Sequence, residues 1–170
     1  MEMIQEGAHI ARHEARRERA IPLAGEYLTW RIGAGEYGVA IEAVQEIRSY
    51  EAPTRVPRAP AGVLGVVNLR GVVVPIVDLR VCLGDAKPEY GERTVVIVLA
   101  LQERVVGVVV DSVSEVLDLA ADAIRPPPEL AGGDAQEFVT GIATLQERML
   151  MLVDMQRLLG PVLGTVAEAA

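Results

Sequence analysis

The chain has 170 residues, of which 51% are apolar, mainly valine and leucine, and its formal net charge is −8. This much apolar material supports a packed core and excludes a disordered chain, and the acidic balance argues against extended nucleic-acid binding, which needs clustered lysine and arginine. Cys82 is the only cysteine, which excludes a disulfide framework and a cysteine zinc site. The longest apolar runs, 95–101 and 105–110, are too short to cross a bilayer, and the N-terminus lacks a signal-peptide core. These features predict a cytoplasmic protein without direct membrane insertion.

Residues 1–25 form a polar N-terminal extension in which apolar residues recur at roughly helical spacing, at Ile4, Ala8, Ala11 and Ala15. Pro22 ends any helix there. Two interpretations stay open: a disordered leader, or a helix that packs on the body or on a partner. His9 and His13, four residues apart, would make half a metal site, but no third ligand is near, so we expect no metal.

The next segment predicts two hairpins. The first joins residues 26–33 to 37–41 through the turn at 33–36. A turn or strand switch over 41–47 follows, then a strand over 48–55 and a proline-rich loop. The second hairpin joins 65–69 to 72–77 around Arg70 and Gly71. Its second strand contains Pro75, which cannot donate to a ladder, and therefore lies at an edge or is bulged. Asp78 is a candidate N-cap for a short helix over 79–83.

The second half of the chain repeats this plan after a polar joint at 85–92. Strands are expected at 94–101, 105–110 and 115–119, with a turn at 111–114 and a long loop at 120–136. Further strands at 137–145 and 149–153 precede a helix over 155–159, with Asp154 as its cap, and a tail over 162–170. Many short strands punctuated by glycine and proline favour small β-barrels over an α/β sheet.

The two halves are also similar in sequence. Residues 65–84 overlay 141–160 without a gap at an offset of 76, and six positions are identical, including Asp78/Asp154 and Gly84/Gly160. Residues 28–47 overlay 97–116 at an offset of 69. A self-match at fixed offset determines the architecture. We therefore expect two copies of one fold, in lobes so small that a shared interface stabilises both.

No constellation of residues supports catalysis. Ser49, Ser112 and Ser114 have no histidine outside the leader to activate them, and Cys82 is better explained as a buried, inert thiol. Asp111 and Glu115 would suit acid–base chemistry, although a solvated turn explains them more simply. There is no phosphate-binding glycine loop. We predict no enzymatic activity and no cofactor, and a recognition groove between the lobes, lined by valines that exceed the needs of one core.

Two runs, 44–48 (VQEIR) and 68–80 (NLRGVVVPIVDLR), together with 94–111, resemble the CheW family of chemotaxis coupling proteins. The resemblance spans about 26–160. It implies an all-β fold of two SH3-like five-stranded β-barrel lobes packed side by side, about 26–84 and about 92–160, with short connecting helices, an N-terminal extension over 1–25 and a C-terminal tail over 161–170.

The resemblance also implies a non-enzymatic adaptor between the cytoplasmic tip of methyl-accepting chemoreceptors and the regulatory domain of the histidine kinase CheA. Such an adaptor is recruited to receptor arrays at the inner membrane. Lobe one of one protein would meet lobe two of the other, and the groove between lobes would take the helical receptor tip. The implied contact residues are Val44, Glu46, Arg70, Val95, Gly107, Val113 and Val116.

Several alternatives stay open at this point. Each valine is either core or contact, and Glu46 either pairs with Arg70 or binds a partner. The adaptor could serve another receptor–kinase pathway, such as one governing surface motility. A hydrolase or small-ligand-binding protein using the inter-lobe cleft would need convergent polar residues, of which the sequence offers only Glu46 and Arg70.

Overall fold

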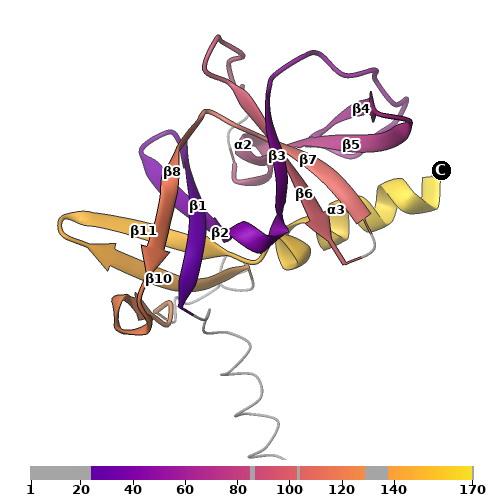
Figure 1. The fold of residues 1–170 in the computed structure, drawn as a ribbon. Coiled ribbons are helices and arrows are strands. Elements are labelled where there is room, and N and C mark those ends of the chain that lie inside the picture. Colours follow the sequence, from indigo (N-terminus) through magenta and orange to yellow (C-terminus); the bar gives the residue numbers. More distant parts are fainter. Residues whose placement is uncertain (1–23, 85–86, 103, 129–137, 170) are drawn as a thin grey trace, which may run out of the picture.

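The computed structural model describes residues 24–84, 87–102, 104–128 and 138–169, with side chains described up to residue 164. Two β-sheets lie side by side, and the C-terminal helix runs from the middle of the molecule along the second sheet (Figure 1). The expected all-β architecture is confirmed. The leader before residue 24 and the loop over 129–137 lie outside the described residues.

Sheet A has six strands. Their order is β8 (Ser112–Leu119), β1 (Gly25–Ile32), β2 (Gly35–Ala40), β11 (Arg148–Val153), β10 (Val139–Leu145) and β9 (Ile124–Arg125). The expected lobe had five strands, and the two-residue β9 adds the sixth at the edge. The 3-10 turn η2 (Ala121–Ala123) leads into β9.

Sheet B has the expected five strands. Their order is β3 (Val44–Ser49), β6 (Val95–Leu101), β7 (Arg104–Val110), β5 (Val72–Asp78) and β4 (Val63–Leu69). The 3-10 turn η1 (Ile41–Ala43) occupies only the first three residues of the switch predicted over 41–47, because β3 already begins at Val44; it carries the chain from β2 in sheet A to β3 in sheet B. The short helix α2 (Leu79–Cys82) follows β5, and the side chain of Asp78 accepts a hydrogen bond from the Arg80 amide at its N-terminus, as predicted.

The internal repeat is visible in the strand pairing. In the hairpin β4–β5, Val63 lies opposite Val77 and a bulge precedes Gly65; in β10–β11, Val139 lies opposite Val153 and a bulge precedes Gly141. These registers are the same at an offset of 76. The parallel pairs also correspond, because β5 joins β7 at Ile76 and Gly107 while β11 joins β2 at Leu152 and Gly38.

The same pairs show that the two copies exchange strands. Sheet A combines residues 25–40 with 112–153, and sheet B combines 44–78 with 95–110. The sheets therefore do not follow the contiguous lobes 26–84 and 92–160 expected from the sequence. Each copy's first hairpin pairs with the second hairpin of the other copy. Because the copies are similar, each strand meets an equivalent partner in the exchanged arrangement.

The main core lies between the sheets. It joins Leu28 and Trp30 of sheet A, Ile97 and Val108 of sheet B, and apolar residues of both α-helices. Each sheet also has its own smaller cluster on the opposite face, one around Leu150 and the other around Val96, Val98 and Val109. Strands β6 and β7 are thus buried on both faces, which produces continuous apolar runs. Val106, Val108 and Val110 of β7 are buried in this shared core, whereas Val72, Val73 and Val116 are exposed.

Several predicted boundaries were wrong. The strand expected over 48–55 ends at Ser49, and the turn expected over 111–114 is already β8. β5 is an interior strand, but it pairs with β7 only from Ile76 onward, so Pro75 needs no donor on that side.

The predicted tail over 162–170 is part of helix α3 (Met155–Ala169), which continues through Pro161. Leu159 and Leu163 lie four residues apart and are 0% and 5% exposed in the main core. Burying such a side chain contributes about 1.5–3 kcal/mol, which is comparable to the cost of an interior proline, about 3 kcal/mol. Packing therefore extends the helix past the residue that the sequence pattern marks as its end.

Candidate interaction surfaces

Glu46 and Arg70 pair with each other, as one of the two interpretations expected. Arg70 Nη2 donates to Glu46 Oε2 at 3.2 Å, and Arg48 Nη1 donates to Glu46 Oε1 at 3.3 Å. Arg70 reaches β3 from the β4–β5 turn, where its positive φ of 52° is followed by Gly71 at 89° and Asn68 accepts from the Gly71 amide. Burial would raise the pKa of Glu46, but the hydrogen bonds from Arg70 and Arg48 outweigh it and lower the pKa. The carboxylate therefore stays charged in this exposed cluster.

The four candidate valines differ in exposure. Val44, on β3, packs partly buried against the main core. Val95 and Val113 do so too, and both line one shallow depression together with Arg31 and Ser112. Val116, on β8, is 49% exposed.

Gly107 differs from the other candidates because it is buried in the core. A Cβ at this position would lie 2.6 Å from Ile76 Cδ1 and 2.8 Å from Val96 Cγ1. A side chain here would have to displace those two side chains, so the position favours glycine where β7 pairs with β5, and its role is packing.

A buried polar cluster was missed by the sequence reasoning. Arg80 is 2% exposed and holds Asp78, which is fully buried, through two hydrogen bonds. Its Nη1 donates to the Glu89 carbonyl at 2.6 Å and to Asp111 Oδ1 at 3.1 Å. Burial opposes the charge, but the hydrogen bonds to Asp78 and Asp111 outweigh it and raise the pKa of Arg80. The sequence signal was Arg80 itself, which follows the apolar strand β5 and its terminal Asp78 by two residues. An arginine is almost never fully buried unless it is paired, so this position called for a charged partner.

This cluster ties the two sheets together. Asp111 follows β7 of sheet B, and its Oδ2 accepts from the Gly33 amide in the β1–β2 turn of sheet A at 2.7 Å. The Asp111 amide in turn donates to the Arg31 carbonyl. Asp111 is therefore a structural link rather than a catalytic acid.

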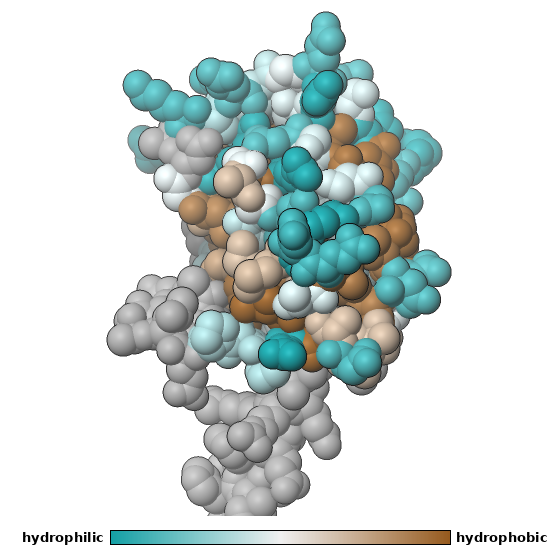
Figure 2. Space-filling model, turned by 90° about the vertical axis from the view of Figure 1, so that its left-hand side faces the viewer, coloured by the Kyte–Doolittle hydropathy of each residue, from teal (hydrophilic) through white to brown (hydrophobic). Residues whose placement is uncertain are grey.

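A second charged network crosses sheet A. Arg148 on β11 donates to Glu36 on β2 through Nε and Nη2, and to Glu115 on β8 through Nη1 at 2.8 Å. Arg31 on β1 donates to the other Glu36 oxygen at 2.9 Å. Asp111 is bound by Arg80 and Glu115 by Arg148. The two carboxylates therefore do not work together, and the hypothesis that they form an acid–base pair is rejected. Figure 2 shows the side of the molecule that sheet A occupies in Figure 1, where polar and apolar areas lie next to one another.

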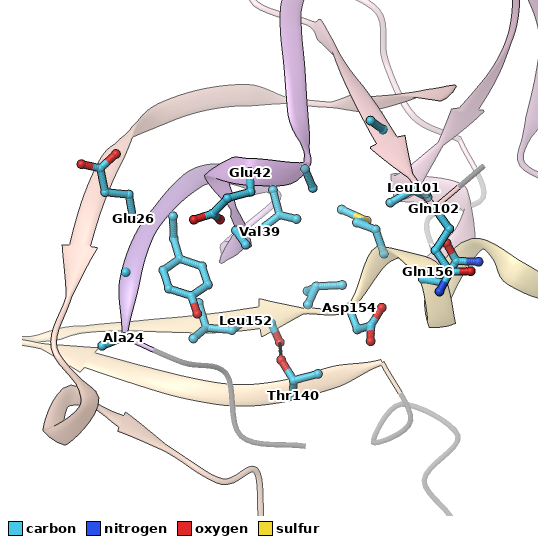
Figure 3. A pocket seen from close by; sticks show the side chains of 17 residues that line it. Ala24, Glu26, Val39, Glu42, Leu101, Gln102, Thr140, Leu152, Asp154 and Gln156 are labelled. Carbon is cyan, nitrogen blue, oxygen red and sulfur yellow. Dashed lines mark hydrogen bonds between the residues drawn. The ribbon is translucent and has the colours of Figure 1, made fainter. Parts of the chain in front are cut away.

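The inter-sheet cleft of about 520 Å³ lies between the start of β1, the end of β6 and the start of α3. Its floor is apolar, with Tyr27, Val39, Leu152 and Met155 among its lining residues (Figure 3). Thr140 Oγ1 already donates to the Leu152 carbonyl. Within the described part of the chain no three histidine, cysteine or acidic residues form a metal-binding group. The described lining includes carboxylates but no serine, cysteine or histidine, so the nucleophile and base of a Ser-His or Cys-His hydrolase are not found among these residues.

Comparisons with known proteins agree with this fold. A family model described as the CheW-like domain matches residues 26–161. A chemotaxis protein CheW from Klebsiella aerogenes is 53% identical over 134 residues, which are 79% of this chain and 81% of that protein. The chain belongs to the CheW family. It is a CheW-type chemotaxis coupling and scaffold protein, and the family is non-enzymatic.

Two further CheW proteins show the same match at lower identity. The chemotaxis protein CheW of Bacillus subtilis is 31% identical over 127 residues, covering 75% of this chain and 81% of that protein. The crystal structure of the scaffolding protein TtCheW from Thermoanaerobacter tengcongensis has a TM-score of 0.71 at 27% identity, covering 78% of this chain and 90% of that one. The sequence-based resemblance is thereby confirmed. Among the described residues no helix is long and apolar enough to span a membrane.

Proposed function

We propose that this CheW-family protein joins the cytoplasmic tip of methyl-accepting chemoreceptors to the regulatory domain of the histidine kinase CheA, and is recruited to receptor arrays at the inner membrane. The observation that supports this most is that each sheet carries its own exposed apolar side chains. Val116 and Met149 lie on sheet A, and Ile47, Val72 and Val73 lie on sheet B. An adaptor needs two separate docking surfaces, and exposed apolar side chains favour partner contact.

The receptor surface comprises the candidate residues other than Gly107 and runs across both sheets: Val113 and Val116 on sheet A, Val44, Glu46 and Val95 on sheet B, and Arg70 in the β4–β5 turn. It combines apolar side chains with the charged pair of Glu46 and Arg70, whose side chains are 26% and 73% exposed. A helix that docks with one apolar face and a charged flank fits such a surface. Glu46 and Arg70 then contact each other and also form the charged edge of the surface that the receptor helix meets.

The kinase surface is the tip of the β4–β5 hairpin. Val72 and Val73 are 53% and 65% exposed there. Because the chain has two related sheets, a partner with the same two-lobed plan would present an equivalent surface, and heterologous contacts between unlike surfaces can close or propagate. Each contact is then small, and many of them act together through multivalency.

Two single substitutions separate the surfaces. Val73→Asp is expected to weaken binding of the isolated kinase regulatory domain and to leave binding of a receptor cytoplasmic fragment unchanged. Val116→Asp is expected to do the reverse. Met149→Asp is the matched control, because Met149 is 63% exposed but lies in neither surface. Isothermal titration of each partner near physiological salt measures the three variants.

The binding data also state what would contradict the proposed function. If the unsubstituted protein binds neither partner, the proposal is wrong. Loss of both partners in a single variant, with unchanged thermal unfolding, would show one shared surface instead of two.

A further inference from the structure

We infer that the inter-sheet cleft is the docking site for the chain's own N-terminal segment, residues 1–23. The cleft begins where the described chain begins, because Ala24, Gly25 and Glu26 line it. The preceding segment therefore enters the molecule at the cleft. The proposal is independent of the partner surfaces, because the cleft shares none of their residues.

The cleft has an acidic rim around an apolar floor. Glu26, Glu42 and Asp154 line it, and Figure 3 shows Glu26 at the outer edge with its carboxylate pointing away from the other lining side chains. Asp154 already pairs with Arg157, whose Nε lies 3.6 Å from Asp154 Oδ2, so the attraction for a basic segment rests on Glu26 and Glu42. Burial and, secondly, the charge of Glu42 raise the pKa of Tyr27, which lies on the floor, so the carboxylate acts on the interior of the cleft. In the described part of the chain, Gln102 and Gln156 add amide groups to the opposite wall. Among the described residues that line the cleft, none is basic.

The part of the N-terminal segment nearest the cleft, residues 12–23, has the complementary chemistry, although over 1–23 as a whole the four arginines are balanced by four glutamates. Residues 12–19 contain four arginines and two glutamates, and the apolar residues Ile21 and Leu23 stand immediately before Ala24. An extended chain spans at most about 3.3–3.6 Å per residue, so Arg19 reaches roughly 17 Å from Ala24 and Arg12 roughly 40 Å. Both distances allow contact with the rim. Ile21 and Leu23 are placed to cover the floor.

The covalent connection makes weak docking sufficient. A short tether holds the segment at an effective concentration on the order of millimolar, so an intrinsic affinity in that range populates the docked state. Charge attraction at an exposed rim is screened by salt. Docking should therefore weaken as ionic strength rises.

A spin label on the full-length chain tests this inference. Cys82 is replaced by alanine, Ala15 by cysteine, and a nitroxide is attached at position 15, which keeps all four arginines. The label is expected to cause selective loss of NMR peak intensity for the amides of Gln102 and Gln156, compared with Asn68 and Val73 in the β4–β5 hairpin. High salt should restore the lost intensity.

Charge reversal supplies the matched comparison. Glu26→Lys combined with Glu42→Lys should restore the intensities, because both side chains are exposed and both line the cleft. Glu51→Lys combined with Glu147→Lys reverses two exposed carboxylates outside it and should leave the loss in place. Trp30 fluorescence on heating verifies that each variant is folded.

Three results would overturn the inference: no selective loss at the cleft, a loss centred on another face, or a loss that survives reversal of Glu26 and Glu42. A loss seen only when labelled chains are mixed with unlabelled, isotope-enriched chains would assign the cleft to a second copy and would also overturn it.

Discussion

Arg80 and Asp78 form a bidentate ion pair inside the protein, with Nε 2.9 Å from Oδ1 and Nη2 2.9 Å from Oδ2. Two parallel hydrogen bonds between planar groups fix both side chains. Because Asp78 also caps α2 and Arg80 also holds Asp111, the pair connects the end of sheet B to the first turn of sheet A.

Removing the positive charge of Arg80 should lower the free energy of unfolding. Arg80→Met leaves the carboxylate of Asp78 buried without its charged partner, and breaking a buried pair in this way costs about 3–5 kcal/mol of the free energy of unfolding. Arg93→Met is the control, because Arg93 is exposed and such changes stay within about 0.5 kcal/mol. Denaturant titration followed by the fluorescence of Trp30, the only tryptophan, measures both. A loss below about 1 kcal/mol would contradict the structural role of the pair.

Tyr90 should lose its hydroxyl proton at a higher pH than an exposed tyrosine. Burial and then its hydrogen bond to Asp78 Oδ2, at 2.7 Å, raise the pKa of Tyr90 to about 12. Since the folded pKa lies above the unfolded value of about 10, its contribution to stability is complete below pH 10 and is lost as the pH rises toward 12. Burial also raises the pKa of Tyr27, Tyr37 and Tyr50, so ultraviolet titration of the phenolates should show a component near pH 12 that is missing in Tyr90→Phe. A difference curve centred near the unfolded value would contradict this.

Gly107→Ala should destabilise the protein without touching a partner surface. The added methyl group would approach Ile76 and Val96 more closely than real Cβ atoms do, and overpacking of this kind costs about 1–3 kcal/mol. Gly160→Ala is the control, since nothing lies within 4 Å of its Cβ position and alanine is favoured over glycine in a helix by about 1 kcal/mol. Thermal unfolding should move in opposite directions for the two variants.

The pair of Glu46 and Arg70 can be separated from a partner contact by charge reversal. Glu46→Arg and Arg70→Glu should each weaken receptor binding, since each leaves like charges beside one another. If mutual pairing is what matters, the double variant restores most of the affinity. If either side chain binds the receptor directly, the double variant stays as weak as the weaker single one. Titration with a receptor fragment distinguishes these outcomes.

Much of the local structure could be predicted because short-range physics determines it. Arg70 and Gly71 mark a tight hairpin, and Asp78 and Asp154 are placed to cap the helices that follow them. The failures were of a different kind. β8 begins directly after Asp111 because the chain crosses between sheets there, and α3 continues past Pro161 because Leu163 finds the core. Both depend on neighbours distant in sequence.

The amino-acid sequence by itself determined that two similar units exist, where their hairpins turn, which faces are apolar and to which family the chain belongs. The tertiary structure alone decided that the units exchange hairpins, which valines are buried between the sheets and which are exposed, and that Arg80 meets Asp111. The physical reason is the repeat itself. A strand that fits its own copy fits the other copy equally well, so periodicity cannot distinguish the two pairings, and only the packing of the complete chain selects one.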